Sequence, residues 1–191
     1  MDSVEIEVKF RVADIAALTG QLRSLGFREQ TPRTFEHNVL FDTPEHRLRA
    51  SRSILRIRRY GERWVLTHKS LPENHDPTER HKHRQETETE VEDGEALATV
   101  FERLGYTRTF VYEKWRTEYT DGVGHCVIDE TPIGLFAELE GPEDWIDRQS
   151  RALDLAPGDL FTLSYGRLFE AWREETGSAA GQLTFAECAS R

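Results

Sequence analysis

Charged side chains recur at every second position along most strand-like segments of this chain, and within several segments they carry one sign. In residues 4–10, Glu5, Glu7 and Lys9 alternate with apolar residues, and in residues 54–60, Arg56 and Arg58 do the same. Side chains alternate between the two faces of a strand, so each segment has one charged face and one apolar face. Like charges two residues apart repel, and they need partners of opposite sign. We therefore expect the apolar faces to pack against helices and the charged faces to line an enclosed polar space.

Fourteen charged residues make up this predicted interior face. The acidic members are Glu5, Glu7, Glu86, Glu88, Asp129, Glu138 and Glu140, and the basic members are Lys9, Arg56, Arg58, Lys69, Arg84, Lys114 and Arg116. The solvent face of an ordinary antiparallel sheet also carries polar residues at every second position, so one strand alone would not distinguish the two arrangements. The sorting of whole strands by sign favours the enclosed one. If these faces were exposed to solvent instead, every site assignment based on them would fail together.

The wider pattern predicts a single α+β domain over residues 1–175, followed by a loosely ordered tail over 176–191. Strands are expected at 4–10, 35–41, 54–60, 63–69, 84–91, 112–120, 125–130 and 135–140, and helices at 14–25, 93–104, 143–153 and 164–175. Segments 79 residues apart resemble each other: the first two helices each begin at an aspartate and end in Leu-Gly-aromatic. Two such halves would pair into a closed β structure with charged interior faces.

The formal net charge of −10, from 35 acidic and 25 basic residues, argues against a long surface for nucleic acid. No apolar run approaches the roughly 18 residues that a membrane-spanning helix needs, and the first residues lack the pattern of a signal peptide. We therefore expect a cytoplasmic protein without a membrane partner, and we leave a homodimer open. The net charge does not exclude a small anion held inside, because the fourteen interior charges cancel.

A space lined by both signs of charge suits a triphosphate with divalent metal ions. Arginine and lysine bind phosphoryl oxygens, arginine often through two parallel hydrogen bonds. Neighbouring carboxylates hold Mg²⁺ or Mn²⁺, and the ion bridges the phosphates. The residues alone therefore predict a small triphosphate as substrate and Mg²⁺ or Mn²⁺ as cofactor.

Short motifs follow one another in a specific order along the chain. They are Glu-Ile-Glu-Val-Lys at 5–9, Phe-Asp-Thr-Pro at 41–44, Leu-Arg-Ile-Arg at 55–58, Leu-Thr-His-Lys at 66–69, Arg-Gln-Glu-Thr-Glu at 84–88, Lys-Trp-Arg at 114–116, Ile-Asp at 128–129, Gly-Leu-Phe-Ala-Glu-Leu-Glu-Gly at 134–141 and Ser-Tyr at 164–165. This order resembles the CYTH superfamily, the triphosphate tunnel metalloenzymes, which includes class IV adenylyl cyclases, thiamine triphosphatases and inorganic triphosphatases. The resemblance implies an eight-stranded antiparallel closed β-barrel, a tunnel open or nearly open at both ends, with helices packed outside.

The resemblance also implies roles for the interior residues. The positions that match triphosphate-binding residues are Lys9, Arg56, Arg58, Lys69 and Arg116, and those that match metal-binding carboxylates are Glu5, Glu7, Glu138 and Glu140. Three further acids, Asp129, Glu86 and Glu88, match positions that complete the metal and water network, while Arg84 and Lys114 fit the inward pattern and join the predicted substrate-binding set. Lys9, Glu5 and Glu7 are the predicted catalytic residues. Glu5 or Glu7 would help to position a water molecule, but the sequence assigns no general base.

The leading hypothesis is hydrolysis of inorganic triphosphate or of a small organic triphosphate, such as thiamine triphosphate or a nucleoside triphosphate. The first alternative is a class IV adenylyl cyclase, which converts ATP to cyclic AMP and pyrophosphate in the same kind of charged cradle. We find no residue set that indicates an adenine site. A non-catalytic module that binds polyphosphate or nucleotides is a second alternative. A barrel for an apolar ligand would need inward apolar residues, which the predicted interior face contradicts.

Three histidines, His75, His81 and His83, lie in or beside a polar loop over residues 72–83 and form the pattern H-x5-H-x-H. A metal site is one interpretation, but metal-bound imidazoles usually need oriented partners, so we favour solvated histidines. Asp42 is expected to accept backbone hydrogen bonds in a turn. Ser164 is expected to cap a helix, with a packed aromatic residue after it.

Overall fold

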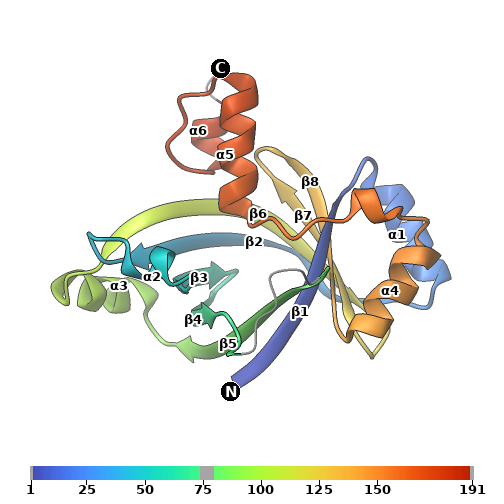
Figure 1. Ribbon diagram of the computed structural model, residues 1–191, viewed down its shortest axis with the longest axis horizontal. Helices are drawn as coiled ribbons and strands as arrows, with labels where there is room; N and C mark the ends of the chain where they lie inside the picture. The colour runs from blue at the N-terminus through green and yellow to red at the C-terminus, as the bar shows by residue number, and fades with distance from the viewer. Residues whose placement is uncertain (1, 74–79, 190–191) are drawn as a thin grey trace.

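The computed structural model describes residues 2–73 and 80–189, which form an eight-stranded antiparallel barrel with helices on its outside (Figure 1). The strands are β1 (Asp2–Arg11), β2 (Arg28–Asp42), β3 (Ile54–Tyr60), β4 (Arg63–Ser70), β5 (Lys82–Val91), β6 (Thr107–Thr120), β7 (His125–Thr131) and β8 (Gly134–Glu140). The helices are α1 (Ile15–Ser24), α2 (Arg47–Ala50), α3 (Gly94–Arg103), α4 (Glu143–Ala152), α5 (Tyr165–Thr176) and α6 (Phe185–Cys188), with a short 3-10 turn at Pro157–Asp159. The predicted α+β fold class is confirmed.

The barrel is built from two similar halves, as the repeat predicts. The strands close in the order β1-β5-β4-β3-β2-β6-β7-β8, so the first strands of the two halves pair, and so do the second strands. Asp14 and Asp93 cap α1 and α3 by accepting backbone hydrogen bonds. Both helices stop before a glycine with positive φ, 88° at Gly26 and 93° at Gly105, a conformation that costs glycine little.

The apolar core lies outside the barrel wall, between the strands and the helices. Leu22 of α1 and Trp145 and Ile146 of α4 are fully buried against outward residues of the strands, such as Val8 and Leu139. A second cluster packs α3 against β2 and β3. Each buried large apolar side chain contributes about 1.5–3 kcal/mol. This arrangement leaves the inward faces of the strands free to carry charge.

Residues 178–189, part of the predicted tail, include α6 and contact the outer edge of β6. Strand β6 extends beyond the part that pairs with β7, and its outer edge needs hydrogen-bond partners. The tail supplies them: Val111 N donates to the Gln182 side chain at 2.6 Å, and Glu113 N donates to Leu183 O at 2.9 Å. Leu183 is fully buried. These hydrogen bonds hold Gln182 and Leu183 against the edge of β6.

Two local predictions are confirmed. Asp42 accepts backbone hydrogen bonds from Thr43, Leu48 and Arg49, which holds the turn around α2. Ser164 caps α5 by accepting from Arg167 N. Among the described residues, no helix has the length and apolar character needed to cross a membrane.

Candidate active site

A cavity of about 540 Å³ runs inside the barrel, and charged side chains from the strands line it. Twelve of the fourteen predicted interior residues are among its lining: Glu5, Glu7, Lys9, Arg56, Arg58, Lys69, Glu86, Glu88, Lys114, Arg116, Glu138 and Glu140. The other two are Asp129, which is fully buried beneath Lys114, Arg116 and Tyr165, and Arg84, which is partly buried and outside the lining. The inward faces of the strands thus bring together almost all of the residues that the alternation selects.

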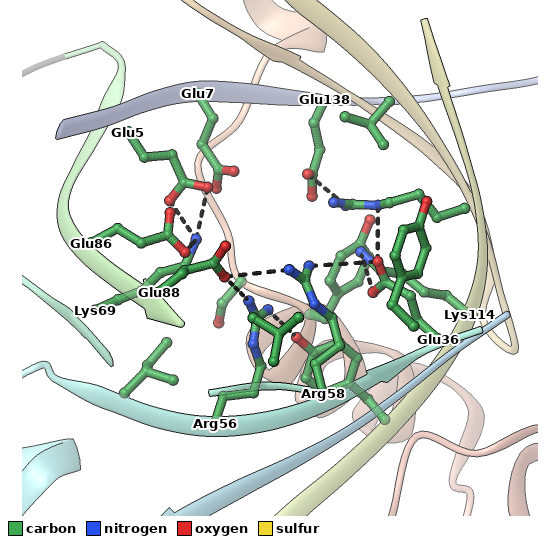
Figure 2. A pocket seen from close by; sticks show the side chains of 18 of the residues that line it. Glu5, Glu7, Glu36, Arg56, Arg58, Lys69, Glu86, Glu88, Lys114 and Glu138 are labelled. Carbon is green, nitrogen blue, oxygen red and sulfur yellow. Dashed lines mark hydrogen bonds and ion pairs between the residues drawn. The ribbon is translucent and has the colours of Figure 1, made fainter. Parts of the chain in front are cut away.

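One part of the cavity, the basic half, contains Arg56, Arg58 and Lys114 (Figure 2), and Lys9 and Arg116 also line it. Glu36 of β2 lies at its centre, 1% exposed, with Arg58, Lys114 and Arg116 each 3.6 Å from its carboxylate. Burial alone would raise the pKa of Glu36, but these three cations outweigh burial and lower it to about 2. Glu36 is therefore a permanent anion that several cations share.

Two further carboxylates hold the basic residues in place. Asp129 accepts from Lys114 at 2.9 Å and from Arg116 at 2.7 Å, and the Tyr165 hydroxyl donates to it at 2.5 Å. Glu138 pairs with Lys9 and accepts from Arg116 at 2.8 Å. These bonds fix the direction of the cationic groups before any anion binds.

The end of the cavity beside the basic half is lined by aromatic side chains and by the start of α5. Tyr165 stacks on Tyr112 at 6.0 Å and meets Phe136 edge-on at 5.9 Å. Tyr112 and Tyr165 line the cavity here, and Phe136 packs against Tyr165 in the apolar cluster beneath α5. The N-terminal turn of α5, with Ser164 and Gly166 in the lining, also brings the positive end of a helix dipole to the cavity.

The opposite part, the acidic half, contains Glu5, Glu7, Glu86 and Lys69 (Figure 2), and Glu140 and Lys82 also line it. Lys69 lies 2.6 Å from Glu5 and 3.1 Å from Glu86. Lys82 pairs with Glu7. Burial alone would raise the pKa of Glu7, but Lys82 and Lys9 hold it at about 2.

Two carboxylates of the acidic half, Glu140 and Glu86, have raised pKa values. Burial, followed by the charges of Glu5 and Glu7, raises the pKa of Glu140 to about 8. Burial and the charge of Glu5 also raise the pKa of Glu86. The raised pKa values show that the negative charge of these carboxylates is not balanced by the neighbouring lysines. A bound cation would balance it, and carboxylate oxygens are ligands that suit Mg²⁺ or Mn²⁺. The donor set of Glu5, Glu7, Glu86 and Glu140 therefore fits the metal that the sequence predicts.

Glu88 lies between the two halves, and its Oε1 atom contacts residues of the basic half. The Thr67 hydroxyl donates to it at 2.6 Å, while Arg56 and Arg58 lie at 3.4 and 3.3 Å. Glu88, Glu138 and Asp129 were expected among metal ligands from the resemblance. In the structure all three carboxylates contact arginine or lysine side chains, and these contacts orient the basic side chains.

The predicted interior face does not include Glu36 or Lys82, and both line the cavity. Glu36 stands alone among Phe35, His37 and a neutral Asn38, so no run of like charges marks it. Lys82 lies two residues before the predicted start of its strand at residue 84. In the structure β5 begins at Lys82, and this side chain points into the cavity, where it pairs with Glu7. A rule that extended each charged face by two residues would have found Lys82.

Two of the three histidines from the polar loop contact α4, and His75 lies outside the described residues. His81 is 7% exposed and lies 3.1 Å from Asp147. His83 lies 3.2 Å from Glu143. The interpretation of solvated histidines is therefore wrong for His81, because α4 covers it.

Comparison with known proteins gives one family and several relatives. The model of the CYTH domain matches residues 3–149. A Methanocaldococcus jannaschii protein named "Putative adenylate cyclase MJ0240" is 26% identical over 152 residues, covering 79% of this chain and 84% of the relative. Adenylate cyclase CyaB of Aeromonas hydrophila is 31% identical over 140 residues, covering 71% of this chain and 67% of the relative. The PH1012 protein of Pyrococcus horikoshii shares the fold with a TM-score of 0.73 and 25% identity, covering 86% of this chain and 98% of that one.

Proposed function

The chain belongs to the CYTH domain family of triphosphate-processing enzymes, and we propose that it hydrolyses inorganic triphosphate or a small organic triphosphate with a divalent metal ion. One observation carries this proposal: the two halves of the cavity have opposite charge imbalances. The basic half holds more cations than acids, and the acidic half holds more acids than cations. A triphosphate with a bound divalent ion complements both halves at once.

The acidic half would hold the metal through Glu5, Glu7 and Glu140, with Glu86 nearby. A bound Mg²⁺ or Mn²⁺ supplies Lewis-acid neutralisation of phosphoryl charge and favours ionisation of a water molecule. Glu140, with its pKa of about 8, would release its proton when the cation arrives. Glu7, with its pKa of about 2, is a carboxylate throughout the neutral range and would orient water by accepting a hydrogen bond.

The basic half would bind the phosphate chain. Arg56, Arg58 and Arg116 present planar guanidinium groups, and Lys9 and Lys114 add point charges. Because Glu36, Asp129 and Glu138 already fix four of these groups and Glu88 contacts the fifth, Arg56, little reorganisation accompanies charge development on the phosphoryl oxygens. Preorganised cations of this kind stabilise a transition state more than a flexible lysine cluster would.

Product analysis tests the proposal. The protein is incubated with tripolyphosphate or with ATP, each with Mg²⁺ or Mn²⁺, and the products are separated by ion-exchange chromatography. We expect orthophosphate and pyrophosphate from tripolyphosphate. Tight binding of tripolyphosphate without any product would contradict hydrolysis and support a binding module.

Adenylate cyclase activity is the second candidate, because both relatives described above carry that name. The two activities need the same cradle but differ in the bond that breaks. In the same assay a cyclase converts ATP to cyclic AMP and pyrophosphate and leaves tripolyphosphate intact. That pair of results would replace hydrolysis by cyclisation.

A further inference from the structure

A cluster of ionisable side chains lies on the outside of the barrel, away from the cavity. It consists of His81 and His83 at the start of β5 and Glu143 in the first turn of α4. One potential ligand atom from each residue lies within 4.8 Å of the others. His81 Nδ1 is 3.6 Å from Glu143 Oε2, and His83 Nε2 is 3.2 Å from Glu143 Oε1. Both imidazoles thus contact one carboxylate group.

The strand register explains why residues 60 positions apart meet here. Strand β1 lies between β5 and β8, with Ile6 opposite His83 and Glu7 opposite Glu140. Gly141 N donates to Ile6 O at 3.1 Å, which brings the β8–α4 connection across β1. Glu143 follows two residues later and therefore stands beside His83. The pairing of β1 with β5 and β8 therefore places Glu143 near His83.

A second carboxylate orients His81. Asp147 lies one turn after Glu143 on α4, and its Oδ1 is 3.1 Å from His81 Nε2. Arg80 in turn lies 3.1 Å from the other oxygen of Asp147. An Nε2–H that donates to Asp147 leaves a lone pair on Nδ1, which faces Glu143. Metal-binding histidines commonly have this carboxylate partner on the second ring nitrogen.

We propose that His81 Nδ1, His83 Nε2 and the Glu143 carboxylate bind a transition-metal ion of the Zn²⁺ type, with water as a further ligand. Two imidazoles and a carboxylate are ligands that Zn²⁺ accepts in tetrahedral geometry, whereas Mg²⁺ prefers oxygen alone. The Glu143 side chain is 55% exposed, so the site opens to solvent and metal has a path to it.

The bound ion joins the start of β5 to α4 from outside. Lys82, between the two histidines, points the other way and pairs with Glu7 inside the cavity. The proposed outer site and the acidic half therefore lie on opposite sides of the same strands, with different ligand chemistry. The outer site needs no catalytic step and does not depend on the proposed hydrolysis.

Cobalt absorption tests the proposal directly. The full chain is treated with a chelator, dialysed and titrated with Co²⁺. Tetrahedral Co²⁺ with nitrogen ligands gives intense visible bands, and octahedral Co²⁺ with oxygen ligands gives weak ones. We expect intense bands that saturate at one ion per chain and that Zn²⁺ abolishes by displacement.

Variants locate the ion. His83→Ala and Glu143→Gln should abolish the intense bands, while His68→Ala, an exposed histidine of β4, and Glu140→Gln, a cavity carboxylate, should retain them. Asp147→Asn should weaken Co²⁺ binding by about 10–100-fold with the bands unchanged in shape. Circular dichroism checks that each variant is folded. Absence of intense bands from the folded parent chain, or their survival in folded His83→Ala, would overturn the proposal.

Discussion

The two halves of the cavity place buried glutamates in opposite electrostatic situations. Glu36 in the basic half lies among three cations, which hold its pKa at about 2. Glu140 in the acidic half is also largely buried, yet burial and two neighbouring glutamates raise its pKa to about 8. Both residues sit on inward faces of the same barrel. The comparison shows that the two halves carry opposite excess charge. The basic half would be balanced by a bound anion, and the acidic half by a bound cation.

The largest effect should follow from removing the central anion of the basic half. Glu36→Gln leaves Arg58, Lys114 and Arg116 without their shared carboxylate, and loss of one partner of a buried ion pair costs about 3–5 kcal/mol. Urea unfolding at pH 7 measures this difference. The control is Glu62→Gln, whose side chain is 94% exposed and which should cost almost nothing.

The effect of Glu36 should also depend on pH. Because its folded-state pKa lies below the ordinary 4.5, the stabilisation is fully present above about pH 5 and is lost as the pH falls towards 2. The difference between the parent chain and Glu36→Gln should therefore be constant from pH 5 to 7 and shrink below pH 4. A difference that grows on acidification would contradict the assigned charge state.

The next effect concerns activity. Lys9→Ala removes a buried cation of the basic half, and loss of one preorganised group of this kind lowers kcat by about 10²–10³-fold. We expect this loss in tripolyphosphate hydrolysis, with the circular dichroism spectrum unchanged. Arg108→Ala is the matched control, since Arg108 pairs with α3 on the outside. Undiminished turnover in Lys9→Ala would contradict the tunnel account.

A smaller effect should appear in the acidic half. Glu140→Gln removes one carboxylate of the proposed Mg²⁺ site, and the Mg²⁺ concentration for half-maximal thermal stabilisation should rise by at least about tenfold. Differential scanning fluorimetry without any triphosphate gives this value. Glu62→Gln should match the parent chain. Equal Mg²⁺ dependence in Glu140→Gln would place the metal elsewhere.

Glu140 should also make the stability of the chain depend on pH. Its folded-state pKa exceeds the ordinary 4.5, so the folded chain binds this proton more tightly than the unfolded chain between pH 4.5 and 8. Stability of the parent chain relative to Glu140→Gln should therefore fall as the pH rises through this range. Saturating Mg²⁺ should reduce the difference, because the cation takes the place of the proton. A difference independent of pH would show that Glu140 titrates normally.

Alternation within single strands predicted most of the charged side chains that line the cavity, whereas the eight-stranded barrel was implied by the order of the motifs along the chain. The pair Arg56 and Arg58 needs only its own strand to be recognised, and so does the pair Glu138 and Glu140. The central position of Glu36 depends on strand order, since its partners come from β3 and β6 on either side of β2. A single glutamate among the apolar and neutral residues of this segment does not indicate that basic side chains from two other strands surround it.

The same reason explains the outer cluster and the tail. His81 meets Asp147 only because β1 lies between β5 and β8 and places α4 over it. Leu183 is buried because β6 extends beyond its pairing with β7 and exposes an edge. Each contact depends on the register of strands distant in sequence, which alternation within one strand does not specify.

A crystal structure with tripolyphosphate and Mn²⁺ tests the central claim most directly, because anomalous scattering locates the manganese. The account predicts a manganese peak within bonding distance of Glu5, Glu7 or Glu140, with the phosphates on Arg56, Arg58 and Arg116. Manganese beside Glu36, or a triphosphate bound outside the barrel, would contradict it.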